Sequence, residues 1–369
     1  MKLISIELSD FRNYDKQEII FSPNKNFIIG KNAQGKTNLL ESIYLLCLSK
    51  SFRTSKEKEA IAFSKEQFII KGVFELDIGI HQKVVLICSK SNGKQISVNR
   101  KSVSRMADFI GSLPVVISSP EEYELTNGPP PHRRRLVDIL LSQINKRYIH
   151  SLIEYQRIIK QKSAILQKGK LHGKINIKEI EPWNERLIEV GAKIIEQRDI
   201  FSKELSTILT SVYSNLIING EKLEFYYQPD LEYENIDDIK EKIATKLNQL
   251  LKKEQQRGIC LVGPHRDDYI FKINGKNLKK FGSRGQHKTV LISLAIAEYQ
   301  LIKNILNTEP ILLIDDLYSE LDSDREQKIT QTIDQLGQVF ITSTVANQQN
   351  MSDNKNICFT VNNGIVQKN

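Results

Sequence analysis

Apolar and polar positions alternate along most of the first 120 residues, as they do in β-strands, and one helix interrupts this pattern. A strand over Asn26–Gly30 is followed by a helix over Thr37–Cys47, where apolar residues recur at helical spacing. The other strands expected in this part of the chain are Lys2–Leu8, Phe68–Asp77, Lys83–Ser89 and Val115–Ser118. This pattern predicts an α/β domain.

Between Pro129 and about Lys253, the spacing of apolar residues changes to that of helices. Two long stretches have one apolar face each, and a segment rich in Gly and Lys, Lys168–Lys178, lies between them and is predicted to be a loop. The apolar positions are Leu152, Tyr155, Ile159 and Leu166 in the first stretch, and Leu187, Ile194, Phe201, Leu205, Leu209, Val212 and Leu216 in the second. We expect residues 121–255 to form a helical arm.

Alternation of strands and helices returns after about Gly258. A long helix is predicted over Gln286–Ile305, and a short buried strand over Ile311–Ile314. The remaining elements are a helix over Arg325–Leu336, a strand over Val339–Thr342 and a terminal hairpin. Residues 1–120 and 256–369 are therefore expected to build one discontinuous head with the arm inserted.

Residues 30–37 have the pattern G-x4-G-K-[ST] of a phosphate-binding loop between a strand and a helix. The glycines let backbone N–H groups point at phosphate oxygens, and the helix N-terminus favours negative charge. Lys36 would act in catalysis by neutralising the β and γ phosphates of ATP, and the hydroxyl of Thr37 would bind Mg²⁺. The expected nucleotide-binding residues are Gly30, Lys31, Asn32, Ala33, Gln34, Gly35, Lys36 and Thr37.

A second phosphate-site motif is the buried strand Ile311–Ile314 with the two carboxylates that follow it. Asp315 would hold Mg²⁺ through water, because Mg²⁺ keeps several waters and takes few protein ligands. Asp316 would position the attacking water. Asp315 comes 279 residues after Lys36, and a helical insertion of this size indicates the ABC class of ATPases and its SMC relatives.

The ABC class requires two further motifs. Ser283, Arg284, Gly285 and Gln286 stand directly before the long helix, as an ABC signature does, and Ser319 and Asp322 fit its D-loop. In this class the signature of one subunit closes over the γ-phosphate bound to the other. ATP should therefore hold two chains together as a homodimer, for which two-fold symmetry is the natural arrangement.

The charge of the chain favours polyanionic partners. The net charge is +9 and the pI about 9.1, which fits nucleic acid as well as an ordinary lysine-rich surface. The N-terminus has no signal-peptide pattern, and the apolar runs are too short to cross a bilayer. The spacing in the sequence does not match a zinc site for any of the four cysteines, Cys47, Cys88, Cys260 and Cys358. We expect a cytoplasmic protein without a membrane partner.

Taken together, these and other stretches resemble the RecF family of ABC/SMC-type ATPases. The stretches appear in family order and span nearly the whole chain: Phe11–Tyr14, residues 30–44, Ser51–Thr54, Ser119–Glu121, Arg133–Arg135, Tyr155-Gln156, Gly263–Asp268, Ser283–Thr289, residues 311–322 and Gln338–Thr342. The resemblance implies an α/β fold, with an ABC/SMC-like P-loop ATPase head and an inserted helical arm domain. It also implies that Arg12 reaches the nucleotide.

The resemblance further implies a role in recombinational gap repair, in DNA replication and in the SOS response to DNA damage. A family member binds double-stranded DNA and gapped DNA, especially at junctions of single and double strands, as an ATP-dependent homodimer. It acts with RecR and RecO to load RecA, and ATP and Mg²⁺ are its cofactors.

Two departures from the ABC pattern predict slow, weak ATP hydrolysis that resets a DNA clamp. Asp316 stands where many ABC enzymes have Glu, and its shorter side chain should hold water less well. The histidine expected after the last core strand is replaced by Thr342-Ser343-Thr344. Hydrolysis would then work as a timer and would not drive a motor.

Some residues have two interpretations at this stage. Arg12 is either a nucleotide contact or a surface arginine, and Arg133–Arg135 either contacts phosphate or braces the arm against the head. His265 is expected to be a turn residue and not a base, and the lysines of Lys168–Lys178 a solvated face.

Three rival classes remain open on the sequence. An ABC-class nuclease would need a second unit with its own carboxylates, and an SMC-like structural protein would need heptads over hundreds of residues. A metabolic P-loop kinase would lack the signature and the D-loop. The positive charge also argues against the kinase.

Overall fold

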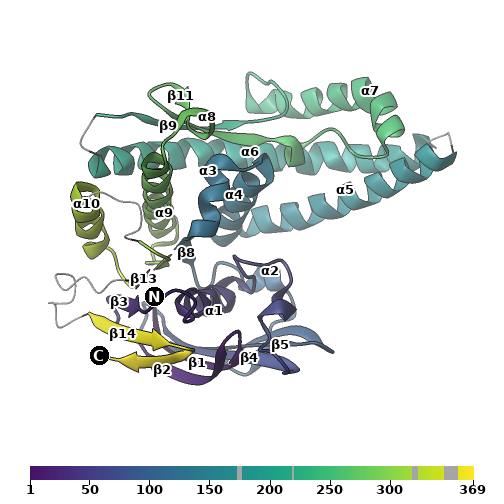
Figure 1. The fold of residues 1–369 in the computed structure, drawn as a ribbon. Helices are drawn as coiled ribbons and strands as arrows, with labels where there is room; N and C mark the ends of the chain where they lie inside the picture. Colours follow the sequence, from purple (N-terminus) through teal and green to yellow (C-terminus); the bar gives the residue numbers. More distant parts are fainter. Residues whose placement is uncertain (173–176, 218–219, 318–322, 345–355) are drawn as a thin grey trace. The chain divides into compact units, whose positions relative to one another are not determined.

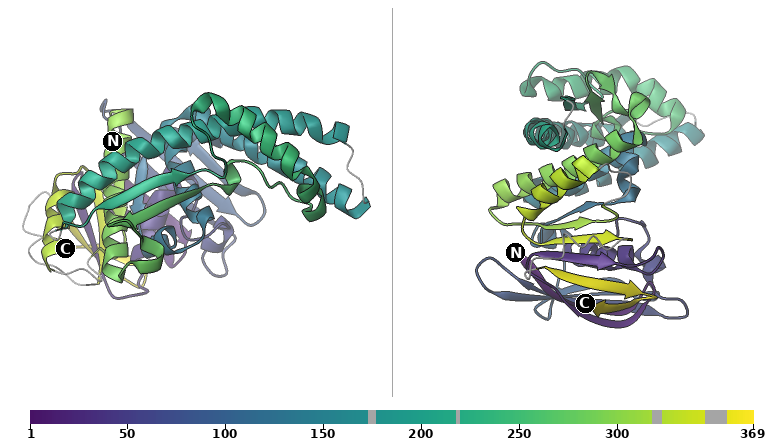
Figure 2. Two further views of the ribbon diagram at one scale, coloured as in Figure 1. Left: turned by 90° about the horizontal axis from the view of Figure 1, so that it is seen from above. Right: turned by 60° about the vertical axis from the view of Figure 1, so that its left-hand side comes forward.

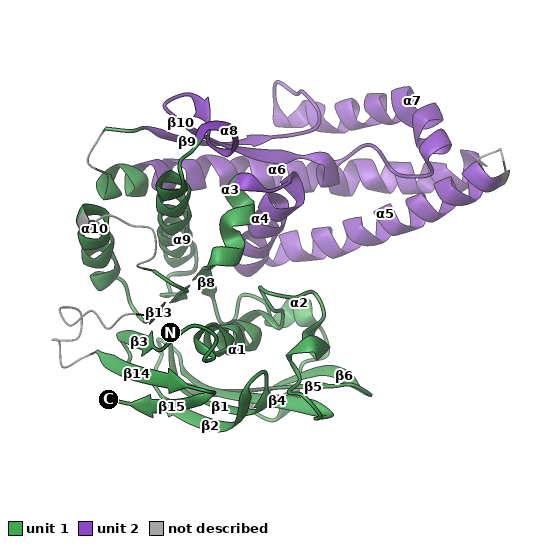
Figure 3. Cartoon of the chain, viewed as in Figure 1, with its two compact units in different colours: residues 1–126, 211–221, 282–369 green, residues 127–210, 222–281 purple. Residues whose placement is uncertain are grey.

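The computed structural model divides into two compact units, which are coloured separately in Figure 3. It describes residues 1–172, 177–217, 220–317, 323–344 and 356–369 (Figure 1). Unit 1 comprises Met1–Thr126, Ser211–Glu221 and Gly282–Asn369, and unit 2 comprises Asn127–Thr210 and Lys222–Phe281.

Unit 1 contains an antiparallel sheet of six strands in the order β2-β1-β4-β5-β6-β7. Alternate residues of β4 are buried, as expected when one face of a sheet packs on a core and the other faces solvent. The strands are β1 (Lys2–Phe11), β2 (Tyr14–Ile20), β4 (Gln67–Glu75), β5 (His81–Ser89), β6 (Gly93–Val98) and β7 (Lys101–Ser102).

A second sheet of unit 1 has the order β15-β14-β3-β13-β12-β8, and its strands from β14 to β8 are parallel. Parallel strands are covered on both faces, and β8, β12 and β13 are accordingly buried at every residue. The bounds are β3 (Lys25–Ile29), β8 (Val115–Ser118), β12 (Ile311–Ile314), β13 (Val339–Ser343), β14 (Ile357–Asn362) and β15 (Ile365–Lys368). The loops after β3 and β12 therefore meet at one sheet edge.

Helix α1 (Lys36–Leu48) contacts strands of both sheets, so it lies between them (Figure 2). This position explains why α1 has no polar face, since eleven of its residues are buried. Helix α9 (Arg284–Leu306) packs against β8; it is long and apolar enough to cross a membrane, but most of it is buried in the protein, as in a core helix. Shorter elements of unit 1 are η1 (Glu57–Ala60), α2 (Met106–Phe109), η2 (Pro120–Glu122) and α10 (Ser323–Asp334), while α3 (Tyr123–Asn127) ends one residue past the unit boundary.

Unit 2 consists of helices and a three-stranded antiparallel sheet in the order β11-β10-β9. Helix α5 packs against α4 and α7, and the long α6 continues from unit 2 into unit 1. The elements are α4 (Pro130–Ile144), α5 (Lys146–His172), α6 (Ile177–Leu216), β9 (Leu223–Gln228), η3 (Ile236–Asp238), α7 (Ile239–Arg257), η4 (Pro264–Arg266), β10 (Asp268–Ile273), β11 (Lys276–Asn277) and α8 (Leu278–Phe281).

The structure differs from the sequence expectations in unit 2. Most of the segment Lys168–Lys178 is helical, because α5 continues to His172 and α6 begins at Ile177. The strand β9 lies in a region expected to be helical throughout, and it pairs with β10. This pairing places residues 222–281 with the helices in unit 2, whereas we expected the arm to end at residue 255.

Candidate nucleotide-binding site

The phosphate-binding loop lies between β3 and α1, as its motif requires. Gly35 has φ 117°, a backbone conformation that favours glycine, and an added Cβ would lie 2.7 Å from the Asn13 side chain. A Cβ on Gly30 would lie 2.4 Å from the carbonyl oxygen of Val361 on the neighbouring strand β14. Gly30 is therefore required by the close approach of the β14 backbone, and Gly35 by its own backbone conformation. Lys36 Nζ lies over the loop and donates to the carbonyl oxygens of Gly30 (2.7 Å) and Lys31 (2.9 Å).

The loop is also held from outside its own motif. Asn13 donates to the carbonyl oxygen of Gln34 (2.8 Å), and Tyr14 donates to that of Gly35 (2.9 Å). The backbone N–H of Gly364, in the turn between β14 and β15, also donates to the Gln34 carbonyl (3.0 Å). The terminal hairpin thus supports the loop, a contact that the sequence analysis did not predict.

The two residues predicted to bind metal lie next to each other. Thr37 Oγ1 donates to Asp315 Oδ2 at 2.7 Å. Burial raises the pKa of Asp315, while its hydrogen bonds from Thr342 and Thr37 act in the opposite direction. A hydroxyl and a carboxylate are hard oxygen ligands that suit Mg²⁺, which takes its other ligands from water and phosphate. No cluster of three or more His, Cys, Asp or Glu within the described ranges could hold a metal by itself.

Thr342, which stands where the ABC pattern has a histidine, joins the two carboxylate residues. Its hydroxyl donates to Asp315 Oδ1 and accepts the N–H of Asp316 (2.9 Å). Asp316 has φ 55°, a conformation that is uncommon for residues other than glycine. Lys288 of α9 donates to the carbonyl oxygen of Asp316 (2.8 Å). These bonds fix the backbone at the end of β12.

An open cavity of about 670 Å³ lies over the loop. It is lined by residues from the phosphate-binding loop and by Asp315, Asp316 and Thr342. Burial lowers the pKa of Lys36, while the two carboxylates act in the opposite direction. The cavity is lined by the phosphate-binding loop, by Lys36 and by the carboxylates of Asp315 and Asp316. A nucleoside triphosphate with a divalent cation requires such groups.

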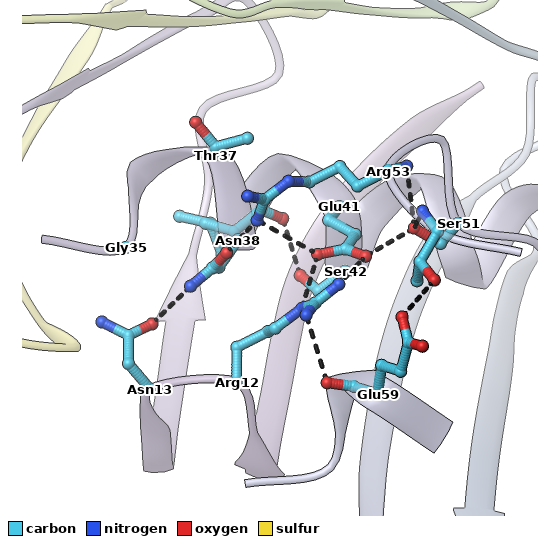
Figure 4. Close-up of polar contacts among 12 residues, drawn as sticks. Arg12, Asn13, Gly35, Thr37, Asn38, Glu41, Ser42, Ser51, Arg53 and Glu59 are labelled. Atoms are coloured by element: carbon cyan, nitrogen blue, oxygen red, sulfur yellow. Dashed lines mark hydrogen bonds and ion pairs between the residues drawn. The ribbon is translucent and has the colours of Figure 1, made fainter. Parts of the chain in front are cut away.

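Arg12 lines this cavity, and its guanidinium is bound by a buried carboxylate (Figure 4). It makes two bonds to Glu41, at 2.9 and 2.7 Å, and one to the carbonyl oxygen of Glu59 (3.2 Å). Glu41 is fully buried in α1 and also accepts the Ser51 hydroxyl (2.5 Å). Paired contacts of this kind hold an arginine in one orientation. Arg12 is therefore positioned at the cavity and is not a free surface side chain.

Arg53 also lines the cavity, beside Arg12 (Figure 4). It donates to Asn38 Oδ1 (2.6 Å) and forms ion pairs with Glu41 (3.7 Å) and Glu121 (3.3 Å). Asn38 follows directly after Thr37 on α1. Arg53 was not among the predicted site residues, although it belongs to the stretch Ser51–Thr54 that resembles the RecF family.

The signature residues begin α9, two residues before the predicted start of the helix. Ser283 and Gln286 cap this helix, and Ser283 and Arg284 are exposed. The residues that line the cavity do not include Ser283, Arg284, Gly285 or Gln286. The structure therefore does not bring the signature into the nucleotide cavity of its own chain. The predicted D-loop residues Ser319 and Asp322 lie outside the described residues.

The arginine cluster Arg133–Arg135 and the loop Gly263–Asp268 make their described contacts within unit 2. Arg133 makes two bonds to Asp268, at 2.8 and 3.0 Å, and Arg134 donates to the carbonyl oxygen of Asp267 (2.6 Å). His265 lies in η4 and shares a 2.6 Å hydrogen bond with Tyr155. These contacts brace parts of unit 2 against one another.

The chain is similar to known proteins along nearly its whole length. The family described as "RecF/RecN/SMC N terminal domain" matches residues 2–367. The chain is 38% identical over 348 residues to the DNA replication and repair protein RecF of Staphylococcus epidermidis, covering 93% of each chain. It is also 38% identical over 347 residues to RecF of Staphylococcus aureus strain JH9, again covering 93% of each chain.

Solved structures give the same result. The recombination mediator protein RecF with ATP, in the RecFOR pathway, superimposes with a TM-score of 0.92 and 31% identity over 100% of this chain and 97% of that one. An SMC head bound to the C-terminal winged-helix domain of ScpA shares the fold, with a TM-score of 0.57 and 14% identity. The expected α/β fold with an ABC/SMC-like ATPase head is confirmed. The chain belongs to the RecF family of DNA replication and repair proteins.

Proposed function

We propose that this chain is an ATP-dependent DNA-binding protein of recombinational gap repair that closes on DNA as a homodimer. The observation that carries the proposal is the 2.7 Å contact between Thr37 and Asp315 inside a cavity lined by the phosphate-binding loop. It supports binding of ATP with Mg²⁺. Solved structures of RecF with ATP and with ATPrS match nearly the whole chain.

The signature residues support closure by a second chain. Ser283 and Arg284 are exposed at the start of α9, and the cavity of the same chain has no signature residue in its lining. A partner's signature would complete the site over the γ-phosphate. ATP binding then contributes directly to the stability of the dimer, because a ligand that binds only the closed state stabilises that state.

Within this proposal the residues have separate tasks. Lys36 neutralises phosphate charge, Thr37 and Asp315 hold Mg²⁺, and Asp316 orients water. Arg12 contributes a positive charge at the side of the cavity. Hydrolysis is slow and reopens the dimer.

The proposed macromolecular partners are double-stranded and gapped DNA, and RecR acting with RecO to load RecA. Two observations support them, the net charge of +9 and the place of the matched RecF structures in the RecFOR pathway. The proposed compartment is the cytoplasm, where DNA, ATP and these partners are found.

The test is binding of a labelled gapped duplex with and without a non-hydrolysable ATP analogue. We expect the analogue to tighten binding and Lys36→Met to abolish that gain. Lys16→Met, which removes one exposed positive charge on β2, serves as the matched control and should keep the gain. Binding that is absent, or equal with and without the analogue, would overturn the proposal.

A further inference from the structure

The Glu221 carboxylate bridges the end of helix α6 and the signature motif. Its Oε2 accepts the hydroxyl of Tyr213 (2.7 Å), and its Oε1 accepts the side-chain amide of Gln286 (2.9 Å). All three residues belong to unit 1. Burial raises the pKa of Tyr213, so its hydroxyl stays protonated and can donate. Both carboxylate oxygens therefore have a defined partner.

The same Gln286 side chain shapes the signature backbone. Its Oε1 accepts the N–H of Ser283 (2.9 Å), and its own backbone N–H donates to Ser283 Oγ (3.2 Å). This reciprocal capping box satisfies N–H groups that the first turn of a helix otherwise leaves open. The amide nitrogen of Gln286 is held by Glu221 and its oxygen by Ser283. The orientation of one side chain thus links Glu221 to the exposed Ser283.

The position of Glu221 is set by the helix that precedes it. Tyr213 is 1% exposed in the last turns of α6, and these turns belong to unit 1 although the earlier part of α6 belongs to unit 2. On α10, Lys328 donates to the carbonyl oxygen of Ile217 (2.9 Å), the residue directly after α6. The end of α6 is thereby tied both to the signature and to the helix that follows the D-loop.

We propose that Glu221, held by Tyr213, is a positioning residue that orients Gln286 and Ser283 so that the signature fits the γ-phosphate bound by a second copy of this chain. The inference rests on the proposed ATP-dependent dimer and adds the residues that prepare its signature. Glu221 touches no nucleotide in its own chain, since it is absent from the lining of the cavity. Its loss should weaken closure of the dimer and leave nucleotide binding by one chain unchanged.

The experiment compares Glu221→Ala, Glu221→Gln and Tyr213→Phe with the wild-type chain. Sedimentation velocity measures dimerisation with a non-hydrolysable ATP analogue, and a fluorescent nucleotide measures binding to dilute monomer. Glu221→Ala should weaken the ATP-dependent dimer roughly tenfold or more, because both of its signatures lose their fixed orientation. Nucleotide affinity of the monomer should stay within about twofold, which is well below one hydrogen bond.

Glu221→Gln is the rescue variant, because its carbonyl can accept from Gln286 while its NH₂ group donates to the Tyr213 oxygen. It should dimerise more tightly than Glu221→Ala. Glu204→Ala, which removes an exposed carboxylate on α6, is the matched control and should behave as wild type. Tyr213→Phe deletes a single oxygen, so it tests the same role of Glu221 if Glu221→Ala does not fold.

The outcomes separate the two proposals. If the wild-type chain binds nucleotide but stays monomeric with the analogue, the proposed function fails and the inference fails with it. If the wild type dimerises and both Glu221→Ala and Tyr213→Phe dimerise equally well, only the positioning role is overturned. Weaker dimers with unchanged monomer affinity, restored in part by Glu221→Gln, support the role.

Discussion

Thr37 Oγ1 donates a 2.7 Å hydrogen bond to Asp315 Oδ2, although the two residues stand 278 positions apart in the chain. The contact exists because β3 and β12 are nearly adjacent parallel strands, separated only by β13, so the loops after them share one edge of the sheet. The phosphate-binding loop and the acidic residues therefore lie at the same end of the parallel strands.

Thr37→Val should weaken binding of the magnesium nucleotide by roughly tenfold or more, because it removes a hydroxyl that Mg²⁺ needs while it keeps the shape of the side chain. Titration with a fluorescent ATP analogue measures the effect in Mg²⁺ and again in EDTA. The variant and the wild type should bind alike in EDTA. An equal loss in both buffers would show that Thr37 acts on the loop and not on the metal.

Thr342→Val tests the hydroxyl that links Asp315 to the backbone N–H of Asp316. Loss of hydrogen bonds to a charged group and to a buried N–H costs about 1.5–3 kcal/mol, so we expect ATP hydrolysis to slow roughly tenfold to a hundredfold. Nucleotide affinity should change little, since the phosphate-binding loop is intact. Steady-state phosphate release measures hydrolysis, and Thr360→Val on β14 is the matched control. Unchanged turnover would remove Thr342 from the catalytic arrangement.

Arg198→Met should destabilise unit 2 by about 3–5 kcal/mol, because it leaves buried charge without a partner. Arg198 is buried and donates to Asp138 (2.8 Å), to Asp267 (2.9 Å) and to the carbonyl oxygen of Pro264 (2.6 Å). Urea unfolding followed by helical circular dichroism measures the loss. Arg186→Met removes an ion pair with Glu154 whose arginine is 56% exposed, and it should cost less than about 1 kcal/mol. Similar costs for the two variants would contradict the role of Arg198 as the centre of this network.

The buried His265 should make unit 2 less stable in acid. Burial lowers the pKa of His265 to about 4, and the neutral ring shares a hydrogen bond with Tyr155 (2.6 Å) while its Nε2 lies 3.2 Å from the carbonyl oxygen of Cys260. The unfolded chain takes up this proton near pH 6.5, before the folded chain does, so stability should fall as the pH drops from about 6.5 towards 4.

Urea midpoints measured across this pH range check the prediction. His265→Gln should flatten the dependence on pH, whereas His150→Gln, at an exposed position of α5, should not. The opposite sign, with stability rising as the pH falls, would mean that the folded state binds the proton more tightly.

The sequence by itself determined the site motifs and the elements that carry them. The strand Ile311–Ile314 and the strand Val115–Ser118 have the predicted bounds, and α1 begins one residue before its predicted start. These elements are predictable because local forces define them: a run of apolar residues ends at charged or turn residues, and glycine permits backbone conformations in the loop that other residues rarely adopt.

Only the tertiary structure decided which distant side chains support those motifs. Strand β9 alternates Leu223, Phe225 and Tyr227 with polar or exposed positions, a strand signal that the surrounding helical pattern concealed, and its pairing with β10 assigned it to unit 2. The Glu221 bridge to Gln286 likewise joins residues 65 positions apart. No local pattern encodes such a bond, because its geometry depends on how strands and helices pack after the chain has folded.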